Sequence, residues 1–331
     1  MDTMRWVRRP EGSNWGAFGP DDQRGRLNLI TREKVLQGIA EVREGLVFCL
    51  SLPLDYPGGN YHDLQRQPPH LEPVVRNGRT KYNLQSQPQH TDVYCDDRVT
   101  LYTHYSTHWD ALAHVGAMFD ADGDGEAEIR YYNGYRGHAD IGGDPPAARA
   151  LGIENMAQAG VQGRAVMVDL LATYGPARRA VSYDDLMRAC EADGVVIEPG
   201  DMLCLHTGQA AALLAMGRQP DRATLEESFC HLDGADARLL RWIDESGIAA
   251  LAADNFAVEA VPPRAAACGS AYEPLHELCL FKLGLHLGEL WHLSELNDWL
   301  RAHGRTRFLL TAPPLRLPGA VGAPATPIGT V

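Results

Sequence analysis

The sequence lacks the signals that mark several large functional classes. No apolar run approaches the roughly eighteen residues of a membrane-spanning helix, and the N-terminal stretch MDTMRWVRRPEGSNWG has no apolar core of a secretory signal. There is no GxSxG, no P-loop and no GxGxxG with an acidic ribose anchor. The usual signatures of serine hydrolases, nucleotide-binding proteins and dehydrogenases are therefore missing.

An excess of positive charge is also absent. The formal net charge is −13 over 331 residues. Nucleic acids and anionic membrane surfaces repel such a chain, so we expect neither as a partner. The acid excess is typical of a soluble, cytoplasmic protein.

The seven cysteines form no CxxC pair, and their number is odd. They stand in apolar runs such as LVFCL and DMLCLHTG. This usage predicts small buried thiols in a reducing compartment rather than a disulfide framework.

The order of apolar segments predicts an α/β protein with a single domain over residues 1–331. Hydrophobic residues make up 45% of the chain, and no repeat or linker divides it. Buried strands alternate with amphipathic helices after residue 160. The expected strands are 164–172, 201–208, 247–255 and 306–313, and the expected helices are 182–193, 235–246 and 294–303.

The first ninety or so residues are largely irregular in pattern, with one exception. Thr31 is expected to be the N-cap of a helix within 31–45 that ends before Gly45, with Val35, Leu36, Ile39 and Val42 on one apolar face. Residues 51–78 are rich in Pro, Gly and polar side chains, which favours a binding loop or a disordered insertion.

The stretch YTHYSTHWDALAHVG holds His104, His108, Asp110 and His114. A helix cannot aim all four inward, because Asp110 would lie about 240° round from His104. On a strand, alternate side chains share a face, so His104, His108 and Asp110 converge. His114 joins them if the chain stays extended or turns back over the site.

Two imidazoles and a carboxylate on one face suit zinc, manganese or ferrous iron. No cysteine is near, and three ligands leave positions open for water, as in catalytic metal sites. His114 need not be a ligand, because an imidazole with a pKa of about 6.5 beside a metal-bound water can act as a general base. The pattern thus predicts a metal-dependent enzyme.

Three alternatives stay open at this point. The four groups could be a polar surface strand. His108, Asp110 and a distant histidine could form the facial triad of a ferrous oxygenase. The chain could also bind metal without catalysis.

Other polar residues are weaker candidates. Asp254 and Glu259 follow an apolar strand and could orient the histidines, although a capping, salt-bridged pair is an equal alternative. His206 ends a strand and could line a pocket or be a satisfied buried histidine. Asp120 begins an EF-hand-like DADGDG run that lacks the required acidic residue at its twelfth position, which indicates an acidic turn.

The histidine cluster resembles the hallmark of the cyclase family of metal-dependent hydrolases, which includes kynurenine formamidases and isatin hydrolases. The family motif is His-x-Gly-Thr-His-x-Asp-x-Pro-x-His, and here it reads His-Tyr-Ser-Thr-His-Trp-Asp-Ala-Leu-Ala-His. Ser106 and Leu112 replace the Gly and the Pro, and Ser106 could crowd or hydrogen-bond in the site. The likeness extends over nearly the whole chain and is greatest to the longer members.

The resemblance implies a divalent metal centre, Mn²⁺ or Zn²⁺, with one or two ions per chain. By analogy, His104, His108 and Asp110 hold the first ion, and Asp110 bridges to a second held by His276 and Glu289. His114 would be the catalytic base. Without the resemblance, His276 and Glu289 would count as a chance pair.

The resemblance also implies a fold and an activity. The fold would be a compact α/β domain of the swivelling β/β/α type around a β-barrel-like core, assembled as a homodimer or larger oligomer. The activity would be hydrolysis of a C–N or C–O bond in a small cyclic amide, imide, lactone or N-formyl amide.

Overall fold

One large mixed sheet organises the chain. The computed structural model describes residues 5–60, 66–85, 87–261 and 270–331. In these residues the sheet has nine strands in the order β1-β21-β19-β13-β15-β17-β18-β8-β20. In chain order they are β1 (Val47–Cys49), β8 (His108–Asp110), β13 (Gln162–Asp169), β15 (Met202–His206), β17 (Ala250–Ala253), β18 (His286–Glu289), β19 (Arg307–Thr311), β20 (Gly322–Pro324) and β21 (Ile328–Thr330).

The middle of the sheet is parallel and its flanks are antiparallel. Strands β13, β15, β17 and β18 pair in parallel, whereas β8 and β20 on one side and β19, β21 and β1 on the other run antiparallel. The sheet curls strongly into a half-barrel. The carboxyl ends of the four parallel strands meet along one edge, which is where α/β proteins place their sites.

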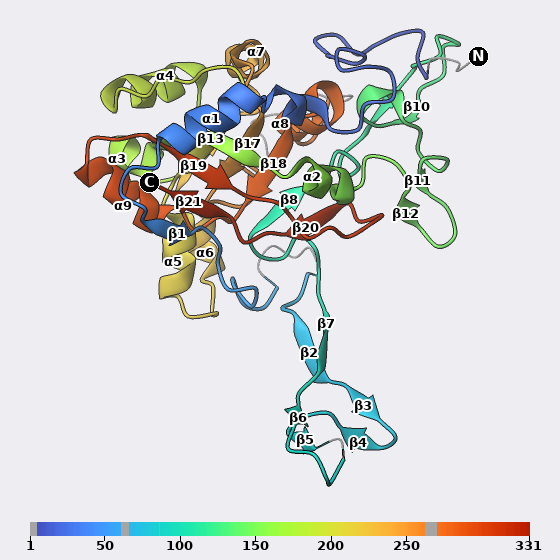
Figure 1. Cartoon of the computed structure of the whole chain (residues 1–331). Coiled ribbons are helices and arrows are strands. Elements are labelled where there is room, and N and C mark those ends of the chain that lie inside the picture. The colour runs from blue at the N-terminus through green and yellow to red at the C-terminus, as the bar shows by residue number, and fades with distance from the viewer. Residues whose placement is uncertain (1–4, 61–65, 86, 262–269) are drawn as a thin grey trace.

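Helices cover both faces of this sheet (Figure 1). The helices are α1 (Arg32–Ala40), α2 (Ile153–Ala159), α3 (Leu170–Tyr174), α4 (Tyr183–Ala192), α5 (Gln209–Ala215), α6 (Arg222–Glu226), α7 (Ala237–Ser246), α8 (Pro274–His276) and α9 (Ser294–Ala302). A π-helix follows α8 over Glu277–Leu283, and 3₁₀ turns occur at Gly25–Leu29 and Tyr132–Gly134. The predicted strands and helices after residue 160 are thus confirmed, with ends shifted by a few residues.

Strand alternation divides the core into two layers. On one face of the sheet, Val166, Leu203 and Leu251 pack with side chains of α4 and α7. The other face carries Met167 and Cys204, which pack with side chains of α9. The mixed α/β class predicted from the sequence is confirmed.

The first helix begins as predicted but presents a different face. The Thr31 hydroxyl accepts a hydrogen bond from the backbone of Lys34, as expected of an N-cap. However, Leu36 and Ile39 are 55% and 49% exposed, while Lys34 and Gly38 are buried. A Cβ on Gly38 would lie 2.7 Å from the backbone nitrogen of Arg164, so only glycine lets the helix approach β13 this closely.

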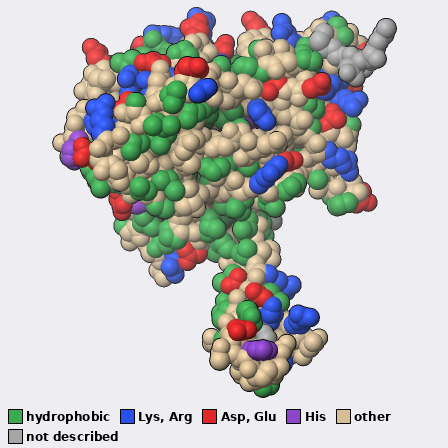
Figure 2. Space-filling view, viewed as in Figure 1, with side chains coloured by type: hydrophobic (Ala, Val, Ile, Leu, Met, Phe, Trp, Pro, Cys, Tyr) green, Lys and Arg blue, Asp and Glu red, His purple; other side chains and the backbone are tan. Residues whose placement is uncertain are grey.

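Residues 70–100 form a hairpin arm that projects from the body (Figures 1 and 2). The prediction of an irregular 51–78 segment is therefore wrong from His70 onward. The paired strands of the arm are β2 (His70–Pro73) with β7 (Asp97–Thr100), β3 (Val75–Arg76) with β4 (Arg79–Thr80), and β5 (Leu84–Gln85) with β6 (Val93–Tyr94). The arm exposes Leu71, Val75, Val93, Tyr94 and Val99. The assembly into a homodimer or larger oligomer, implied by the resemblance, stays a prediction.

Three short two-strand ladders complete the described body. They are β9 (Ala117–Phe119) with β10 (Glu128–Arg130), β11 (Ile141–Gly142) with β12 (Ala147–Ala148), and β14 (Arg179–Val181) with β16 (Cys230–Leu232). Among the described residues, every helix is too short or too polar to cross a membrane.

The burial predicted for the cysteines is confirmed for four of them. Cys190, Cys204, Cys230 and Cys279 are buried free thiols. The prediction is wrong for Cys49 and Cys95, which are exposed because one lies on the edge strand β1 and the other in the arm. Cys268 lies outside the described residues.

A buried ionic cluster fixes α1 to the sheet. The fully buried Asp201 accepts hydrogen bonds from Lys34 Nζ at 3.0 Å and from Arg164 Nε and Nη2 at 2.8 and 3.0 Å. Both cations are themselves buried. Glu198 also pairs with Arg164 at 2.6 Å and with Lys34 at 3.5 Å, but its side chain is 41% exposed. Removal of Asp201 would leave the two buried cations with this half-exposed carboxylate as their remaining partner.

We expect Asp201→Ala to lower the free energy of unfolding by about 3 kcal/mol, the lower end of the cost of breaking a buried ion pair, because Lys34 and Arg164 keep only the half-exposed Glu198. Urea unfolding monitored by circular dichroism measures the change. Asp184→Ala is the matched control, since the Asp184–Arg238 pair is exposed and should cost less than about 1 kcal/mol. Equal losses for the two variants would contradict this interpretation of the cluster.

Candidate metal centre

Two neighbouring strands bring three of the candidate side chains together. In the β18–β8 ladder, Glu289 pairs with His108, so the two side chains lie side by side on the same face. Asp110 lies two residues beyond His108 in β8 and therefore shares that face. The shared parity predicted for His108 and Asp110 is confirmed.

His104 and His114 reach the same point from turns. The predicted strand does not run on to His104, because β7 ends at Thr100 in the arm and β8 begins only at His108. The backbone of His114 donates to Ala111, so the chain turns back over the site, which was the second of the two predicted paths. The rings of His104 and His114 stack with centroids 4.2 Å apart.

Four imidazoles direct Nε2 at the carboxylate of Asp110, and they belong to His104, His108, His114 and His276. The distances to Oδ1 are 3.3 Å from His104, 3.3 Å from His108 and 3.9 Å from His114, and His276 lies 3.9 Å from Oδ2. Asp110 is fully buried, and neither of its oxygens has a hydrogen-bond partner in the described part of the chain. A buried carboxylate without donors needs a cation close by.

Partners on the far side of each ring fix this orientation. His108 Nδ1 donates to the carbonyl of Ser106 at 2.8 Å, and His276 Nδ1 donates to Glu259 at 2.7 Å. The Thr103 hydroxyl lies 3.0 Å from His104 Nδ1. Protonation at Nδ1 leaves the lone pair of Nε2 facing Asp110, which is the form in which histidine binds metals.

The donor atoms form two overlapping groups that share Asp110. One group is His104, Asp110 and His114, and the other is His108, Asp110 and Glu289. In each group, the candidate ligand atoms lie within 4.8 Å of one another. His276 joins the second group, since its Nε2 lies 3.3 Å from Glu289. The structure thus brings together the four residues of the motif and the two, His276 and Glu289, that only the resemblance implied.

The electrostatics of the cluster favour a positive charge at its centre. Burial alone would raise the pKa of Asp110, but the charges of His114, His108 and His104 hold that pKa below its ordinary value. Burial opposes ionisation of His276 as well, yet its hydrogen bonds to Glu259 and Glu289 raise its pKa well above the usual value. A divalent cation would supply the positive charge that these buried carboxylates require.

Two of the weaker candidates, Glu259 and Ser106, contact the candidate ligands. Glu259 accepts from both the ring and the backbone of His276, so the predicted contact with a candidate ligand is present. The carbonyl of Ser106 orients His108, while its hydroxyl donates to Pro53 and does not enter the site. These contacts explain why a serine fits where the family motif has glycine.

Asp254 and His206 lie elsewhere, contrary to the prediction. Asp254 accepts from the backbone of Thr207 and Gly208, at 2.7 Å each, and so holds a turn rather than a candidate ligand. His206 donates to Asp169 at 2.9 Å and does not line the cavity of the metal centre. Its paired, buried state is the alternative that the sequence left open.

His286 supports the centre but was missed by sequence reasoning. It is buried in β18, and its Nδ1 donates to the backbone carbonyl of Asp110 at 2.8 Å. No spacing relates it to the motif, and only the β18–β8 pairing reveals the contact.

A cavity of about 790 Å³ opens from this cluster. Its walls include His108, Asp110, His114, His276 and Glu289. Apolar side chains complete the walls, as is typical of small-molecule sites. They are Leu225, Phe256, Ala257 and Val261.

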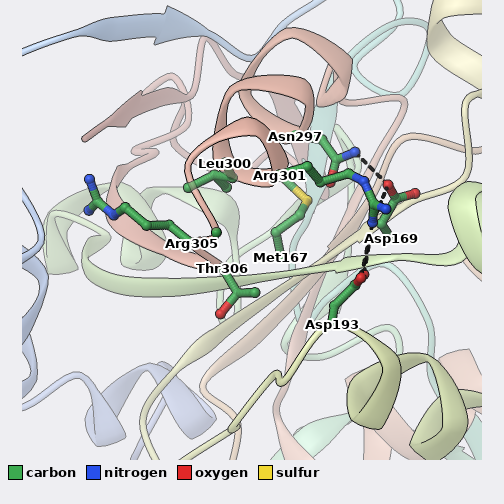
Figure 3. Close-up of a pocket in the computed structure, with 9 residues that line it drawn as sticks. Met167, Asp169, Asp193, Asn297, Leu300, Arg301, Arg305 and Thr306 are labelled. Carbon is green, nitrogen blue, oxygen red and sulfur yellow. Dashed lines mark hydrogen bonds and ion pairs between the residues drawn. The ribbon is translucent and has the colours of Figure 1, made fainter.

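A second hollow of about 150 Å³ lies beside Asp169 (Figure 3). There the guanidinium of Arg301 lies between the carboxylates of Asp169 and Asp193, at 3.3 and 3.0 Å. Asn297 donates to the same Asp169 at 2.7 Å. These charged groups are paired with one another, so the hollow is lined by an ion-pair cluster and the cavity at Asp110 is the stronger candidate site.

We expect His206 to stabilise the protein more at acidic than at alkaline pH. Burial lowers its pKa, but the hydrogen bond to Asp169 and the charge of Asp254 raise it above the ordinary value. The resulting stability is fully present below the unfolded pKa of about 6.5 and is lost as pH rises through the folded pKa.

The difference in unfolding free energy between the wild type and His206→Gln, measured from pH 5.5 to 9, should therefore shrink as pH rises. Asn297→Ala gives the control, because Asn297 donates to the same Asp169 and an amide does not titrate. A difference that grows with pH would contradict the assignment.

Comparison with known proteins places this chain in a family. Residues 49–260 match the family model Cyclase, described as "Putative cyclase". A solved structure titled a novel cyclase is 30% identical, covers 96% of this chain and 97% of its own, and superimposes with a TM-score of 0.78. No curated protein matches the chain.

More distant structures share the fold. Isatin hydrolase A from Ralstonia solanacearum is 18% identical over 90% of this chain and 97% of its own, with a TM-score of 0.56. An isatin hydrolase bound to the product analogue thioisatinate is 15% identical over 91% and 99%, also with a TM-score of 0.56. The family match and the 30% identical structure together show that this chain belongs to the Cyclase family.

Proposed function

We propose that the protein is a metal-dependent hydrolase that cleaves a C–N or C–O bond in a cyclic amide, imide, lactone or N-formyl amide. The observation that carries the proposal is the buried carboxylate of Asp110. Both of its oxygens lack hydrogen bonds among the described residues, and four imidazole Nε2 atoms face it. This donor set of nitrogens and carboxylate oxygens suits Zn²⁺ or Mn²⁺.

The residues fit one or two ions. His104, His108 and Asp110 would hold the first, and His276 and Glu289, with Asp110 between them, would hold the second. The buried Nε2 of His104 has no hydrogen-bond partner in the described chain, which agrees with a ligand role. A bound divalent cation polarises a carbonyl and lowers the pKa of water to about 7.

His114 is the proposed proton carrier. It is the most exposed of the four imidazoles around Asp110, and it lines the cavity where a substrate would lie. Burial lowers its pKa, so the ring is neutral near pH 7 and can accept a proton from the attacking water. It would then deliver that proton to the leaving nitrogen or oxygen.

The geometry gives less support to the oxygenase alternative. A facial triad uses three protein ligands and leaves the remaining positions open. Here His104 and His108 both direct Nε2 at Oδ1 of Asp110, and His276 lies 3.9 Å from Oδ2. Glu289 belongs to the same group of candidate ligands. The chain therefore offers more donors than a triad requires.

We expect His114→Ala to lower kcat by about 10²–10⁴-fold while metal binding persists, because a general base typically contributes that much. Proton release in weak buffer measures the activity on N-formylkynurenine, isatin, simple lactones and cyclic imides. The protein would be stripped with EDTA and then reloaded with Mn²⁺ or Zn²⁺. Full activity of the stripped protein would contradict the proposal.

Two further outcomes separate the roles of His114. A variant that keeps its metal but loses activity supports the base, whereas one that loses its metal indicates a ligand. The exposed His303→Ala serves as control and should behave as the wild type.

We also expect Glu259→Gln to weaken metal binding by about 10–100-fold, because the carboxylate fixes the orientation of His276. Competition with a fluorescent chelator measures the affinity. Glu277→Gln is the control, since Glu277 pairs with Lys282 outside the cluster. An unchanged affinity in Glu259→Gln would show that His276 does not bind the metal.

A further inference from the structure

A buried histidine lies in the wall of the cavity, apart from the metal centre. His231 is only 8% exposed and stands in the middle of β16. Its neighbours Cys230 and Leu232 point into the core, so His231 points to the opposite side, where it lines the cavity. Its Nδ1 is buried and has no hydrogen-bond partner in the described part of the chain.

Gln209 offers a second polar group to the same cavity. The residue is 2% exposed and begins α5. Its Oε1 accepts from the backbone of Phe256 at 2.7 Å, which fixes the side-chain amide. Its amide nitrogen makes no hydrogen bond within the described residues and is available as a donor to a ligand.

The charge at this wall is positive. Arg178 also lines the cavity, and its guanidinium donates to the backbone carbonyls of Glu226 and Val261 rather than to a carboxylate. Burial, together with the charge of Arg178, lowers the pKa of His231 to about 4. A backbone contact with Phe229 raises the pKa slightly but does not offset this lowering, so the ring is neutral near pH 7. With its proton on the unpartnered Nδ1, the ring has one N–H to donate.

The acidic side chains of the cavity do not cancel this charge. Glu226 is exposed and forms an ion pair with Arg222 at 2.6 Å. Glu227 is exposed, so water screens its charge. Glu273 also lines the cavity but lies on the side of the metal centre, where burial and the charges of Glu259, Glu289 and Asp110 raise its pKa.

The backbone ties His231 rigidly to the metal centre. The backbone of Leu232 donates to Val258 and accepts from Ala260, so β16 lies directly beside residues 258–260. Glu259 in this segment holds His276. The separation between the polar wall and the metal centre is thus set by strand pairing rather than by a loop.

We propose that His231 and Gln209, in the field of Arg178, bind a carboxylate at the end of the substrate remote from the hydrolysed carbonyl. This inference rests on the proposed hydrolase function, because it assumes that the metal centre takes the carbonyl end. The substrate class is then an amide, imide or lactone that carries a free acid group.

The donor set fits a carboxylate better than other groups. Two N–H donors match the two oxygens of a carboxylate, and one guanidinium matches its single charge. A neutral amide would gain nothing from Arg178. A phosphate carries about −1.5 to −2 charges, which is more than this wall balances.

Binding of keto acids tests the proposal without turnover. A methyl ketone presents a carbonyl that water cannot cleave, so 4-oxopentanoate, 5-oxohexanoate and 6-oxoheptanoate can be titrated into the Zn²⁺-loaded full chain by calorimetry. The corresponding carboxamides are the neutral comparison. We expect at least one acid to bind about 10–100-fold more tightly than its amide, as a charge-assisted hydrogen bond predicts.

Variants assign the preference to the polar wall. His231→Leu and Gln209→Leu should each bring the acid-to-amide ratio of Kd towards one. Arg178→Gln should do the same, and it tests the charge without a change in the core because Arg178 is exposed. His303→Leu, at the surface, is the control and should leave the ratio unchanged.

Kinetics separate this inference from the proposed function. The formamido acids HCO–NH–(CH₂)n–COO⁻ and their amides would be offered to the same protein, where hydrolysis releases formate and the amine. A ratio near one in the wild type, or a ratio that the three variants leave unchanged, overturns the inference. A strong preference for the keto acids that the variants abolish, without any metal-dependent hydrolysis, would support carboxylate binding at this wall but contradict the hydrolase on which the substrate class rests.

Discussion

The arrangement of the site depends on the carboxylate of Asp110, which is buried without a hydrogen-bond donor in the described part of the chain. The rings of His108 and His276 cannot serve as neutral donors, because their Nδ1 protons are held by Ser106 and Glu259. Without a cation, these rings either turn lone pairs towards a negative charge or take up a second proton, and the raised pKa of His276 reflects the second outcome. A shared cation resolves the conflict, since it binds the carboxylate and the imidazoles at the same time.

The curled sheet makes such crowding possible. Strand β18 delivers Glu289 from the parallel half of the sheet, and antiparallel β8 delivers His108 and Asp110 beside it. The same edge continues through β17 to the segment that carries Glu259. Each ligand candidate thus comes from a strand, from a turn pinned to one, or from the helix that Glu259 holds, and little freedom is left for the cluster to relax by spreading apart.

Sequence reasoning could predict what depends on local spacing, but not what depends on pairing between distant strands. The parity of His108 and Asp110 and the cap at Thr31 follow from a few neighbouring residues. The support from His286 and the polar wall at His231 arise only when β8 meets β18 and when β14 meets β16. The apolar pattern of α1 predicted the wrong buried face, because the helix contacts the sheet through Gly38 rather than through leucine or isoleucine.

The most direct test of this account is the position of a bound ion. Crystals of the protein grown with Mn²⁺ or Zn²⁺, measured at the absorption edge of the metal, would show an anomalous difference peak. The account predicts a peak within coordination distance of the Asp110 carboxylate and the Nε2 atoms of His104 and His108, at about 2.0–2.2 Å. A peak only at the acidic turn of Asp120, Asp122 and Asp124, or no peak in a well-ordered site, would contradict it.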